Sequence, residues 1–238
     1  MTSVLITGGT VRLGKAIAER LRAEGWRVLT SSHRTDADAD IVADLAEPMG
    51  AAKLYAATLQ MLDGNPPDAL VNNAALFTGD DASIAAVNLE SPKKLTTLMA
   101  GREAGVGAVV NILDAAVSSG ERASCPFSVG VDRDVFAQNG QDARSPGGAV
   151  RATSYLASKR KLLDFTRSAA AMFAATLRVN GVAPGPVLAP TEVHEKAGET
   201  LLDRRPTPDD VAAAVSYLLG AESVTGAVIP VDAGQHLT

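Results

Sequence analysis

Short apolar runs alternate along the chain with longer stretches in which apolar residues recur at helical spacing. The first run, residues 3–7, predicts a buried strand, and residues 15–24 predict the helix that follows it. In this helix Ile17 and Leu21 lie one turn apart on an apolar face, and Gly25 ends it. The chain therefore opens with a strand, a turn and a helix.

The same alternation continues through the rest of the chain. Strands are expected at residues 3–7, 27–31, 41–45, 68–72, 108–113, 177–182 and 227–231, and helices at 15–24, 48–62, 83–103, 155–173 and 208–219. Pro92 predicts a kink in the third of these helices. Strands that alternate with helices predict an α/β protein with a Rossmann-type, doubly wound parallel sheet of about seven strands. No repeat, linker or change of composition divides the chain, so residues 1–238 are expected to form a single domain.

The turn after the first strand predicts an anion site. It reads Gly8-Gly9-Thr10-Val11-Arg12-Leu13-Gly14 and opens directly into a helix. Glycine lets the backbone approach a diphosphate closely, and the free N–H groups and dipole of a helix N-terminus favour negative charge. Arg12 stands where the usual dinucleotide fingerprint has a middle glycine, and a tight turn of this kind also occurs in other α/β proteins. The position between a strand and a helix indicates a dinucleotide site.

The residues after the second strand indicate which dinucleotide binds. In NAD enzymes an acidic residue at this point accepts hydrogen bonds from the adenosine ribose. Here the strand runs into Ser31-Ser32-His33-Arg34-Thr35, which has no acid at the strand end. Arg34 suits a ribose 2′-phosphate, because a guanidinium binds phosphate in a bidentate fork. We therefore predict NADP(H); the alternative is that Arg34 is a solvated loop charge, and the acids Asp36, Asp38 and Asp40 lie close by.

Polar and small residues also close the third and fourth strands. Asp44-Leu45 follows the third, where the carboxylate either accepts a hydrogen bond from an adenine amine or caps the loop. Asn72-Asn73-Ala74-Ala75 follows the fourth, where asparagine can pin the backbone and alanine lets a flat ring pass. Because open parallel sheets bind ligands at the carboxyl ends of their strands, these segments should line one crevice.

The candidate chemistry lies beyond the fifth strand. Asp114 follows that strand directly, and Tyr155 and Lys159 are spaced to share a face of the next long helix. A neighbouring ammonium favours the phenolate, so Lys159 is expected to lower the pKa of Tyr155 from about 10. Tyr155 is then a usable general acid. A Tyr-x-x-x-Lys pair taken alone is also typical of a solvated helix face.

Charge and composition exclude several other classes of function. The net charge of −5 argues against nucleic acid as the main partner. No apolar run reaches the roughly 20 residues that span a membrane, so no membrane contact is expected. Cys125 is the single cysteine, and the first strand begins too early for a signal peptide, so we expect a cytoplasmic protein. No residue is assigned to a metal.

Taken together, the motifs resemble the classical short-chain dehydrogenase/reductase family over essentially the whole chain. The matching pieces are Thr7-Gly8 to Gly14, Asp44-Leu45, Asn72-Asn73-Ala74, Val87-Asn88, Tyr155 with Lys159, Arg178 to Gly185 and Val231-Asp232-Ala233-Gly234. Within the family the chain is most similar to pteridine reductases and dihydromonapterin reductases. It shares with them Arg12, His33-Arg34, Asp114 in place of the usual catalytic serine, and the C-terminal end.

The resemblance implies roles for the residues that match. Tyr155 would donate the proton, and Lys159 would hold the nicotinamide ribose and lower the pKa of the tyrosine. Asn88 would hold a water or a backbone element in the proton relay, and Asp114 would contact the substrate and assist its protonation. Phe77 would stack on the pterin.

The resemblance also implies a cofactor site and a substrate site. The cofactor site would comprise Thr7, Gly8, Arg12, Leu13, Gly14, Ser32, His33, Arg34, Asp44, Leu45, Asn73, Ala74, Ala75, Tyr155, Lys159, Pro184, Gly185 and Val187. The substrate would meet Arg12, Phe77, Asp114 and Tyr155. A homotetramer is expected, with the helices at 83–103 and 155–173 packing across a dimer interface.

We therefore predict an NADPH-dependent reductase that transfers a hydride to a pterin-like substrate. Two alternatives remain open: an NADP(H)-dependent carbonyl reductase or alcohol dehydrogenase, and a regulator that binds NADP(H) without turnover. An anion beside a developing alkoxide is unfavourable, so Asp114 argues against the first. The intact set of Asn88, Tyr155 and Lys159 argues against the second.

One feature departs from the family pattern. The stretch between Asp114 and Tyr155 is unusually long, with an insertion at about residues 118–151 that is rich in glycine, proline and charge. Both of its ends lie next to candidate catalytic groups, which predicts a lid over the substrate. A passive loop or a contact between subunits is the competing interpretation.

Overall fold

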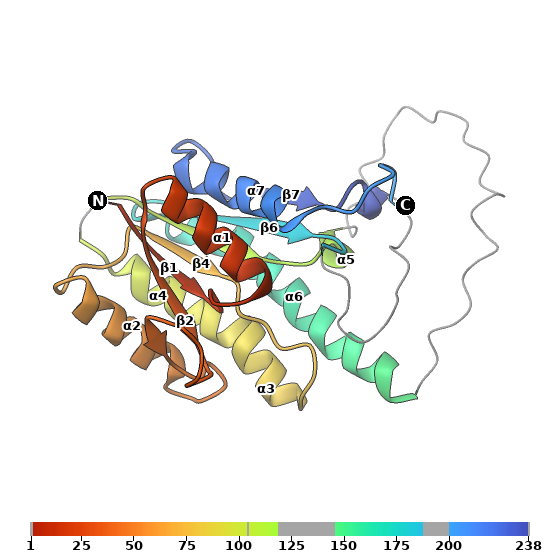
Figure 1. The fold of residues 1–238 in the computed structure, drawn as a ribbon, viewed down its shortest axis with the longest axis horizontal. Coiled ribbons are helices and arrows are strands. Elements are labelled where there is room, and N and C mark those ends of the chain that lie inside the picture. The colour runs from red at the N-terminus through yellow and green to blue at the C-terminus, as the bar shows by residue number, and fades with distance from the viewer. Residues whose placement is uncertain (1, 104, 119–145, 188–199, 238) are drawn as a thin grey trace.

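The computed structural model describes residues 2–103, 105–118, 146–187 and 200–237. Within this part of the chain, seven parallel strands form one sheet in the order β3-β2-β1-β4-β5-β6-β7 (Figure 1). The strands are β1 Ser3–Thr7, β2 Arg27–Ser32, β3 Ile41–Val42, β4 Ala69–Asn72, β5 Gly107–Ile112, β6 Leu177–Pro184 and β7 Val228–Val231. The predicted doubly wound sheet is confirmed. The strand order reverses between β1 and β4, where open parallel sheets bind ligands.

Helices cover both faces of the sheet (Figure 1). They are α1 Arg12–Ala23, α2 Gly50–Met61, α3 Asp81–Ala85, α4 Ser91–Ala100, α5 Ala115–Ser118, α6 Pro146–Met172 and α7 Pro208–Gly220. Successive side chains of a strand point to opposite faces, so Val4 and Ile6 of β1 pack with α1 and α7, whereas Leu5 packs with α2, α4 and α6. Burial on both faces explains why β1, β4 and β5 read as continuous apolar runs.

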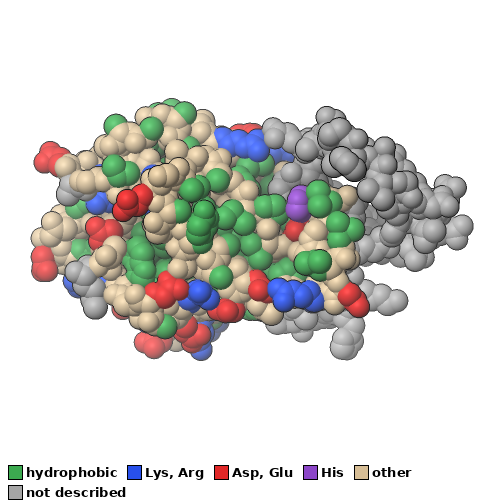
Figure 2. Space-filling view, turned by 90° about the horizontal axis from the view of Figure 1, so that it is seen from above, with side chains coloured by type: hydrophobic (Ala, Val, Ile, Leu, Met, Phe, Trp, Pro, Cys, Tyr) green, Lys and Arg blue, Asp and Glu red, His purple; other side chains and the backbone are tan. Residues whose placement is uncertain are grey.

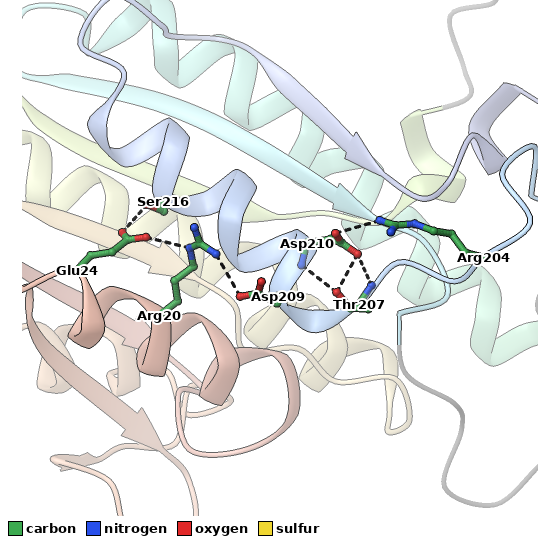
Figure 3. Close-up of polar contacts among 7 residues, drawn as sticks. All are labelled: Arg20, Glu24, Arg204, Thr207, Asp209, Asp210 and Ser216. Atoms are coloured by element: carbon green, nitrogen blue, oxygen red, sulfur yellow. Dashed lines mark hydrogen bonds and ion pairs between the residues drawn. The ribbon is translucent and has the colours of Figure 1, made fainter.

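Polar contacts as well as apolar packing join α1 to α7 (Figure 3). Arg20 donates hydrogen bonds to Glu24, 2.9 Å away, and to Asp209 of α7, 3.2 Å away. Ser216 of α7 donates to the second carboxylate oxygen of Glu24. These contacts fix the helix that begins at the Gly-rich turn against α7.

The helix predicted at 83–103 is divided into three parts. A π-helical turn, η1 Ala86–Glu90, separates α3 from α4, and Pro92 lies in the first turn of α4. Proline cannot donate the backbone hydrogen bond of a regular α-helix, and the wider π turn comes directly before it. The irregularity predicted at Pro92 is therefore centred slightly earlier, on the turn that carries Asn88.

Helix α6 begins at Pro146, well before the predicted start at Tyr155. The last part of the expected insertion, residues 146–151, is thus helical rather than loop. Residues 119–145 lie outside the described part of the chain, so the predicted lid stays a prediction.

The C-terminal end forms a short 3₁₀ helix, η3 Gln235–Leu237, which contacts α5. Among the residues that the structure describes, no helix combines the length and the apolar character that crossing a membrane requires.

Candidate active site

The residues predicted to bind cofactor lie at the carboxyl ends of the parallel strands. Thr7 ends β1, Ser32 ends β2 and Pro184 ends β6. The others follow these ends directly: the turn after β1 carries Gly8, Arg12, Leu13 and Gly14, the segments after β2 and β3 carry His33, Arg34, Asp44 and Leu45, and those after β4 and β6 carry Asn73, Ala74, Ala75, Gly185 and Val187. The structure thus brings the predicted cofactor segments to one edge of the sheet.

The turn between β1 and α1 fits the diphosphate of a dinucleotide. A Cβ atom on Gly14 would collide with the carbonyl oxygen of Gly8, which has a positive φ of 65°, so the turn closes only with glycine at these places. The first turn of α1 contains no acidic residue, and no side chain caps it at Val11. Arg12, with φ of 50°, is exposed and adds a cation at this end. Free backbone amides and a positively charged residue are therefore found at this helix N-terminus, as a phosphate site requires.

Asn73 and Thr7 lock the ends of β1 and β4 together. The Asn73 side chain donates to the carbonyl oxygens of Thr7 and Gly8, at 3.0 and 3.1 Å. The Thr7 hydroxyl accepts from the backbone N–H groups of Asn73 and Ala74, both at 3.0 Å. The prediction that asparagine pins the backbone is confirmed for Asn73 but not for Asn72, whose side chain donates to the Asn111 side chain at 2.8 Å.

The loop after β2 holds Arg34 in a defined position. Its backbone N–H donates to the Ser32 hydroxyl at 3.1 Å, and its guanidinium forms a bidentate pair with Asp36. Asp40 is engaged elsewhere, because its carboxylate accepts from the N–H and hydroxyl of Thr30, both at 2.7 Å. Only Asp36 of the three nearby acids is thus seen to contact Arg34 in the described residues.

Asp44 caps the loop after β3. Its carboxylate accepts from the backbone N–H of Ala46 at 2.8 Å, which is the loop-capping interpretation of this residue. Leu45 is buried, and its carbonyl oxygen accepts from the hydroxyl of Ser91. A contact between Asp44 and adenine stays a prediction.

Asp114 and Tyr155 meet although they are distant in sequence. The Tyr155 hydroxyl donates to the Asp114 carboxylate at 3.0 Å, so the fold brings together the end of β5 and the middle of α6. Tyr155 is 6% exposed. Burial, and then the negative charge of Asp114, raise the pKa of Tyr155 above its usual value.

This pKa direction corrects the expectation that Lys159 lowers the pKa of Tyr155. The Lys159 ammonium lies 5.8 Å from the centre of the Tyr155 ring and donates to the carbonyl oxygen of Ile112 at 2.7 Å. Burial lowers the pKa of Lys159 itself to about 8, against the opposing effect of Asp114. The sequence shows that the two side chains share a helix face, but it does not show that both are buried near a carboxylate. Burial is the largest influence on the pKa of Tyr155.

Asn88 organises the loop opposite the tyrosine. Its side chain accepts from the N–H of Leu76 at 2.7 Å and donates to the Leu76 carbonyl oxygen at 2.9 Å. It also donates to the hydroxyl of Ser158, 3.2 Å away on α6. The expected backbone-holding role is present, and Ser158 is a partner that the sequence reasoning missed. Its position three residues after Tyr155, on nearly the same helix face, was the available signal.

Phe77 lies next to the held Leu76 and stacks on Tyr155. The ring centres are 3.9 Å apart with an interplanar angle of 20°. Phe77 is nevertheless 63% exposed, so its outer face is free to meet solvent or a flat ligand. The structure therefore places Phe77 against Tyr155, the hydrogen-bond partner of Asp114, while its contact with a pterin stays a prediction.

The end of β6 is fixed by the C-terminal turn. Gly185 donates its N–H to the carbonyl oxygen of Val231 at 3.0 Å, and a Cβ atom on it would strike Asp232. Asp232 is buried and accepts from the backbone N–H groups of Gly234 and His236.

In the described residues, no cluster of histidine, cysteine and carboxylate side chains could hold a metal ion.

Two family profiles match this chain. Residues 4–123 match the profile described as NAD dependent epimerase/dehydratase family, and residues 144–236 match the one described as Enoyl-(Acyl carrier protein) reductase. The first match contains the Gly-rich turn and Asp114, and the second contains Tyr155 and Lys159.

Curated relatives cover nearly the whole chain. The chain is 29% identical to pteridine reductase 1 of Leishmania tarentolae over 98% of its length and 96% of that protein. It is 27% identical to the 3-oxoacyl-[acyl-carrier-protein] reductase MabA of Mycobacterium bovis, over 99% of its length and 93% of that protein. The short-chain dehydrogenase/reductase homolog YusR of Bacillus subtilis is 36% identical, over 38% of this chain and 74% of that protein.

A solved structure matches the fold throughout. The FolM alternative dihydrofolate reductase 1 of Brucella canis, in complex with NADP, superposes with a TM-score of 0.77 and 28% identity. The match covers all of this chain and 95% of that one.

Proposed function

The chain belongs to the short-chain dehydrogenase/reductase family, and we propose that within it this protein reduces a dihydropterin-like substrate to its tetrahydro form. It is an NADPH-dependent oxidoreductase, as its relatives and its NADP-bound structural neighbour indicate. The observation that carries the substrate proposal is the hydrogen bond from Tyr155 to the Asp114 carboxylate.

The residues present fit NADPH. The glycine turn before α1 suits the diphosphate, the segment around Arg34 suits the ribose 2′-phosphate, and Tyr155 with Lys159 lies where the nicotinamide end would reach. When bound, the cofactor supplies the hydride. The protein's own residues then have to position the substrate and provide a proton.

Asp114 favours a substrate that carries N–H groups. An ionised carboxylate only accepts hydrogen bonds, so it matches the amino and ring N–H groups of a pterin. A ketone that develops negative charge on its oxygen would be repelled by the same carboxylate. This electrostatic difference is why we assign a nitrogen heterocycle rather than a carbonyl compound.

Tyr155 supplies the proton in this proposal. Its hydroxyl is protonated at neutral pH even at the usual pKa of about 10, and burial and Asp114 raise that pKa further. The hydrogen bond to Asp114 holds the hydroxyl in place. The ring nitrogen next to the carbon that receives the hydride would accept the proton of Tyr155, whose ring lies under that of Phe77. For this the Tyr155 O–H has to turn from Asp114 to the substrate, and the phenolate left behind lies near the Lys159 ammonium. Lys159 holds a positive charge beside this group, and Asn88 fixes the loop that carries Phe77.

A ketone reductase is the second candidate, because one relative is a 3-oxoacyl-[acyl-carrier-protein] reductase. The set of Asn88, Tyr155 and Lys159 would serve that reaction equally well. Asp114 is the residue that separates the two candidates, as the preceding electrostatic argument shows. Binding of NADP(H) without turnover is the least supported alternative, since the complete set of polar groups is in place.

The experiment measures NADPH oxidation by the purified protein with dihydromonapterin, dihydrobiopterin and dihydrofolate, and in parallel with a β-ketoester. The proposal predicts that kcat/KM is highest for one of the pterins. Turnover of the ketone alone would overturn the substrate assignment, and turnover of neither would favour the binding alternative.

We also propose the homotetramer that the resemblance implies, with the helical segments at 83–103 (α3, η1 and α4) and 155–173 (the later part of α6) in a dimer interface. Hydrophobic side chains also gather along the middle of the face seen from above α7, between charged groups at its margins (Figure 2). On that helix Tyr217 is 59% exposed, which suits a contact with another copy. Light scattering at micromolar concentration tests the assembly, and a monomer would contradict it.

A further inference from the structure

We propose that Asp36 is a specificity-determining residue that weakens the preference for a 2′-phosphorylated cofactor by occupying the guanidinium fork of Arg34. The inference rests on the role that we assign to Arg34. It adds a residue that acts against that role, so the affinity for NADPH reflects a competition between an internal carboxylate and the phosphate of the cofactor.

The geometry of the pair is that of a bound oxyanion. Arg34 Nε lies 2.9 Å from one carboxylate oxygen of Asp36, and Nη2 lies 2.6 Å from the other. Two parallel N–H···O bonds of this kind are also how a guanidinium binds phosphate. The carboxylate therefore uses the same edge of Arg34 that a 2′-phosphate would use.

Of the carboxylates near Arg34 in the described residues, Asp36 is the one that contacts its guanidinium. Asp40 is tied to β2 through Thr30, and Asp44 caps its own loop. An exposed aspartate is ionised at neutral pH at its usual pKa, and the Arg34 hydrogen bond holds the pKa of Asp36 lower still. The carboxylate would therefore compete with the phosphate under all ordinary assay conditions.

A phosphate can bind at Arg34 in one of two ways. It must displace Asp36 from the fork, or it must bind beside a like charge; both weaken binding. A cofactor without the 2′-phosphate has no group that would compete with Asp36 or be repelled by it. Removing the charge of Asp36 should therefore improve NADPH binding and leave NADH binding nearly unchanged.

The expected effect is modest, because the pair is solvated. The side chains of Arg34 and Asp36 are 60% and 67% exposed. Exposed ion pairs of this kind correspond to a change in affinity of roughly two- to fivefold. The effect should decrease as the salt concentration rises.

The experiment measures binding to the full-length protein by titration calorimetry, with adenosine 2′,5′-bisphosphate and adenosine 5′-monophosphate as probes. Asp36→Asn should tighten binding of the bisphosphate roughly two- to fivefold and leave binding of the monophosphate unchanged. In an Arg34→Ala background the same substitution should change neither affinity. Asp38→Asn is the matched control, since it removes the same charge from an exposed position in the same loop.

Three results would overturn the proposal. The first is an unchanged or weaker bisphosphate affinity in Asp36→Asn, which would mean that Asp36 is neutral or positions Arg34 for binding. The second is an equal gain in Asp38→Asn, which would reduce the effect to general loop charge. The third is an Arg34→Ala variant that binds the bisphosphate normally, which would remove the premise. Pterin turnover plays no part in the measurement, so its outcome is independent of the substrate proposal.

Discussion

Two carboxylates in this protein each accept a hydrogen bond from a residue with a proposed role in cofactor binding or catalysis. The two contacts differ in their exposure to solvent. Asp36 meets Arg34 two positions away in an exposed loop, whereas the half-buried Asp114, just after β5, meets the buried Tyr155 of α6. Water and salt screen the first pair, and the burial of Tyr155 makes this screening weaker at the second. The comparison teaches that the effect of a carboxylate depends on how well solvent screens it. At Arg34 we expect Asp36 to change the affinity for a ligand by a small factor, whereas at Tyr155 the charge of Asp114 contributes to the raised pKa of the hydroxyl.

The difference also has a structural origin. The loop after β2 makes its contact within a few residues, so it needs no help from the rest of the fold. The Asp114–Tyr155 contact depends on long-range packing, because Leu113 and Val117, on either side of Asp114, share an apolar cluster with residues of α6. Substitutions at the buried pair should therefore have much larger effects than substitutions in the loop.

Tyr155→Phe should produce the largest effect. The substitution removes only the hydroxyl and keeps the ring that stacks on Phe77. Loss of a general acid should lower kcat by roughly 10²- to 10⁴-fold, while the dissociation constant for NADPH changes little. Steady-state kinetics and NADPH fluorescence titration measure the two quantities. A variant that retains kcat within threefold would show that the buried pair is not the proton source.

The pH dependence should show the next largest effect, through Lys159. Burial lowers its pKa to about 8, so the side chain loses its positive charge above this pH in the folded protein. Activity that needs the ammonium should fall up to tenfold per pH unit above about pH 8. Asp114→Asn should move this descending limb to lower pH, because the Asp114 charge raises the pKa of Lys159.

Stability should change in the opposite direction over the same range. Between about pH 8 and the usual lysine pKa of about 10.4, the unfolded chain binds the proton that folded Lys159 has lost. The contribution of Lys159 to the free energy of unfolding therefore rises with pH there. Urea unfolding compared with the Lys159→Met variant isolates this contribution. A decline of activity that follows loss of structure would contradict the assignment.

Arg34→Ala should have a smaller effect, confined to the cofactor. Loss of a solvated charged contact to phosphate should raise the KM for NADPH about tenfold and leave the KM for NADH nearly unchanged. Asp36→Asn should have the smallest effect, a two- to fivefold gain in affinity for the 2′-phosphorylated ligand. An equal rise of both KM values would show that Arg34 has no role in reading the 2′-phosphate.

The sequence predicted what depends on local pattern. The apolar runs placed the strands of the sheet, and the spacing of Tyr155 and Lys159 placed both on one face of a helix. The π turn at Asn88 and the early start of α6 were missed, because both depend on backbone detail that side-chain periodicity does not encode. The direction of the Tyr155 pKa was wrong for a related reason: it depends on burial and on Asp114, which only tertiary packing brings together.

The position of Asp114 was predicted better than its surroundings. Its place after the fifth strand predicted a candidate catalytic group there, and the structure brings it to 3.0 Å from the hydroxyl of Tyr155. Its role in catalysis stays a prediction. The contact of Asn88 with Ser158 was not predicted, since the two residues belong to different helical segments whose packing no local motif specifies.

The most direct test of the account replaces Asp114 by serine, the residue that the family usually has there, and compares two substrates. The wild-type protein and Asp114→Ser are assayed with NADPH against dihydromonapterin and against a β-ketoester, and kcat/KM is determined for each. The account predicts a crossover: the variant should lose at least tenfold with the pterin, because it loses a charged hydrogen bond, and should gain with the ketone. A variant in which both activities change by the same factor would contradict the claim that the Asp114 carboxylate selects the substrate.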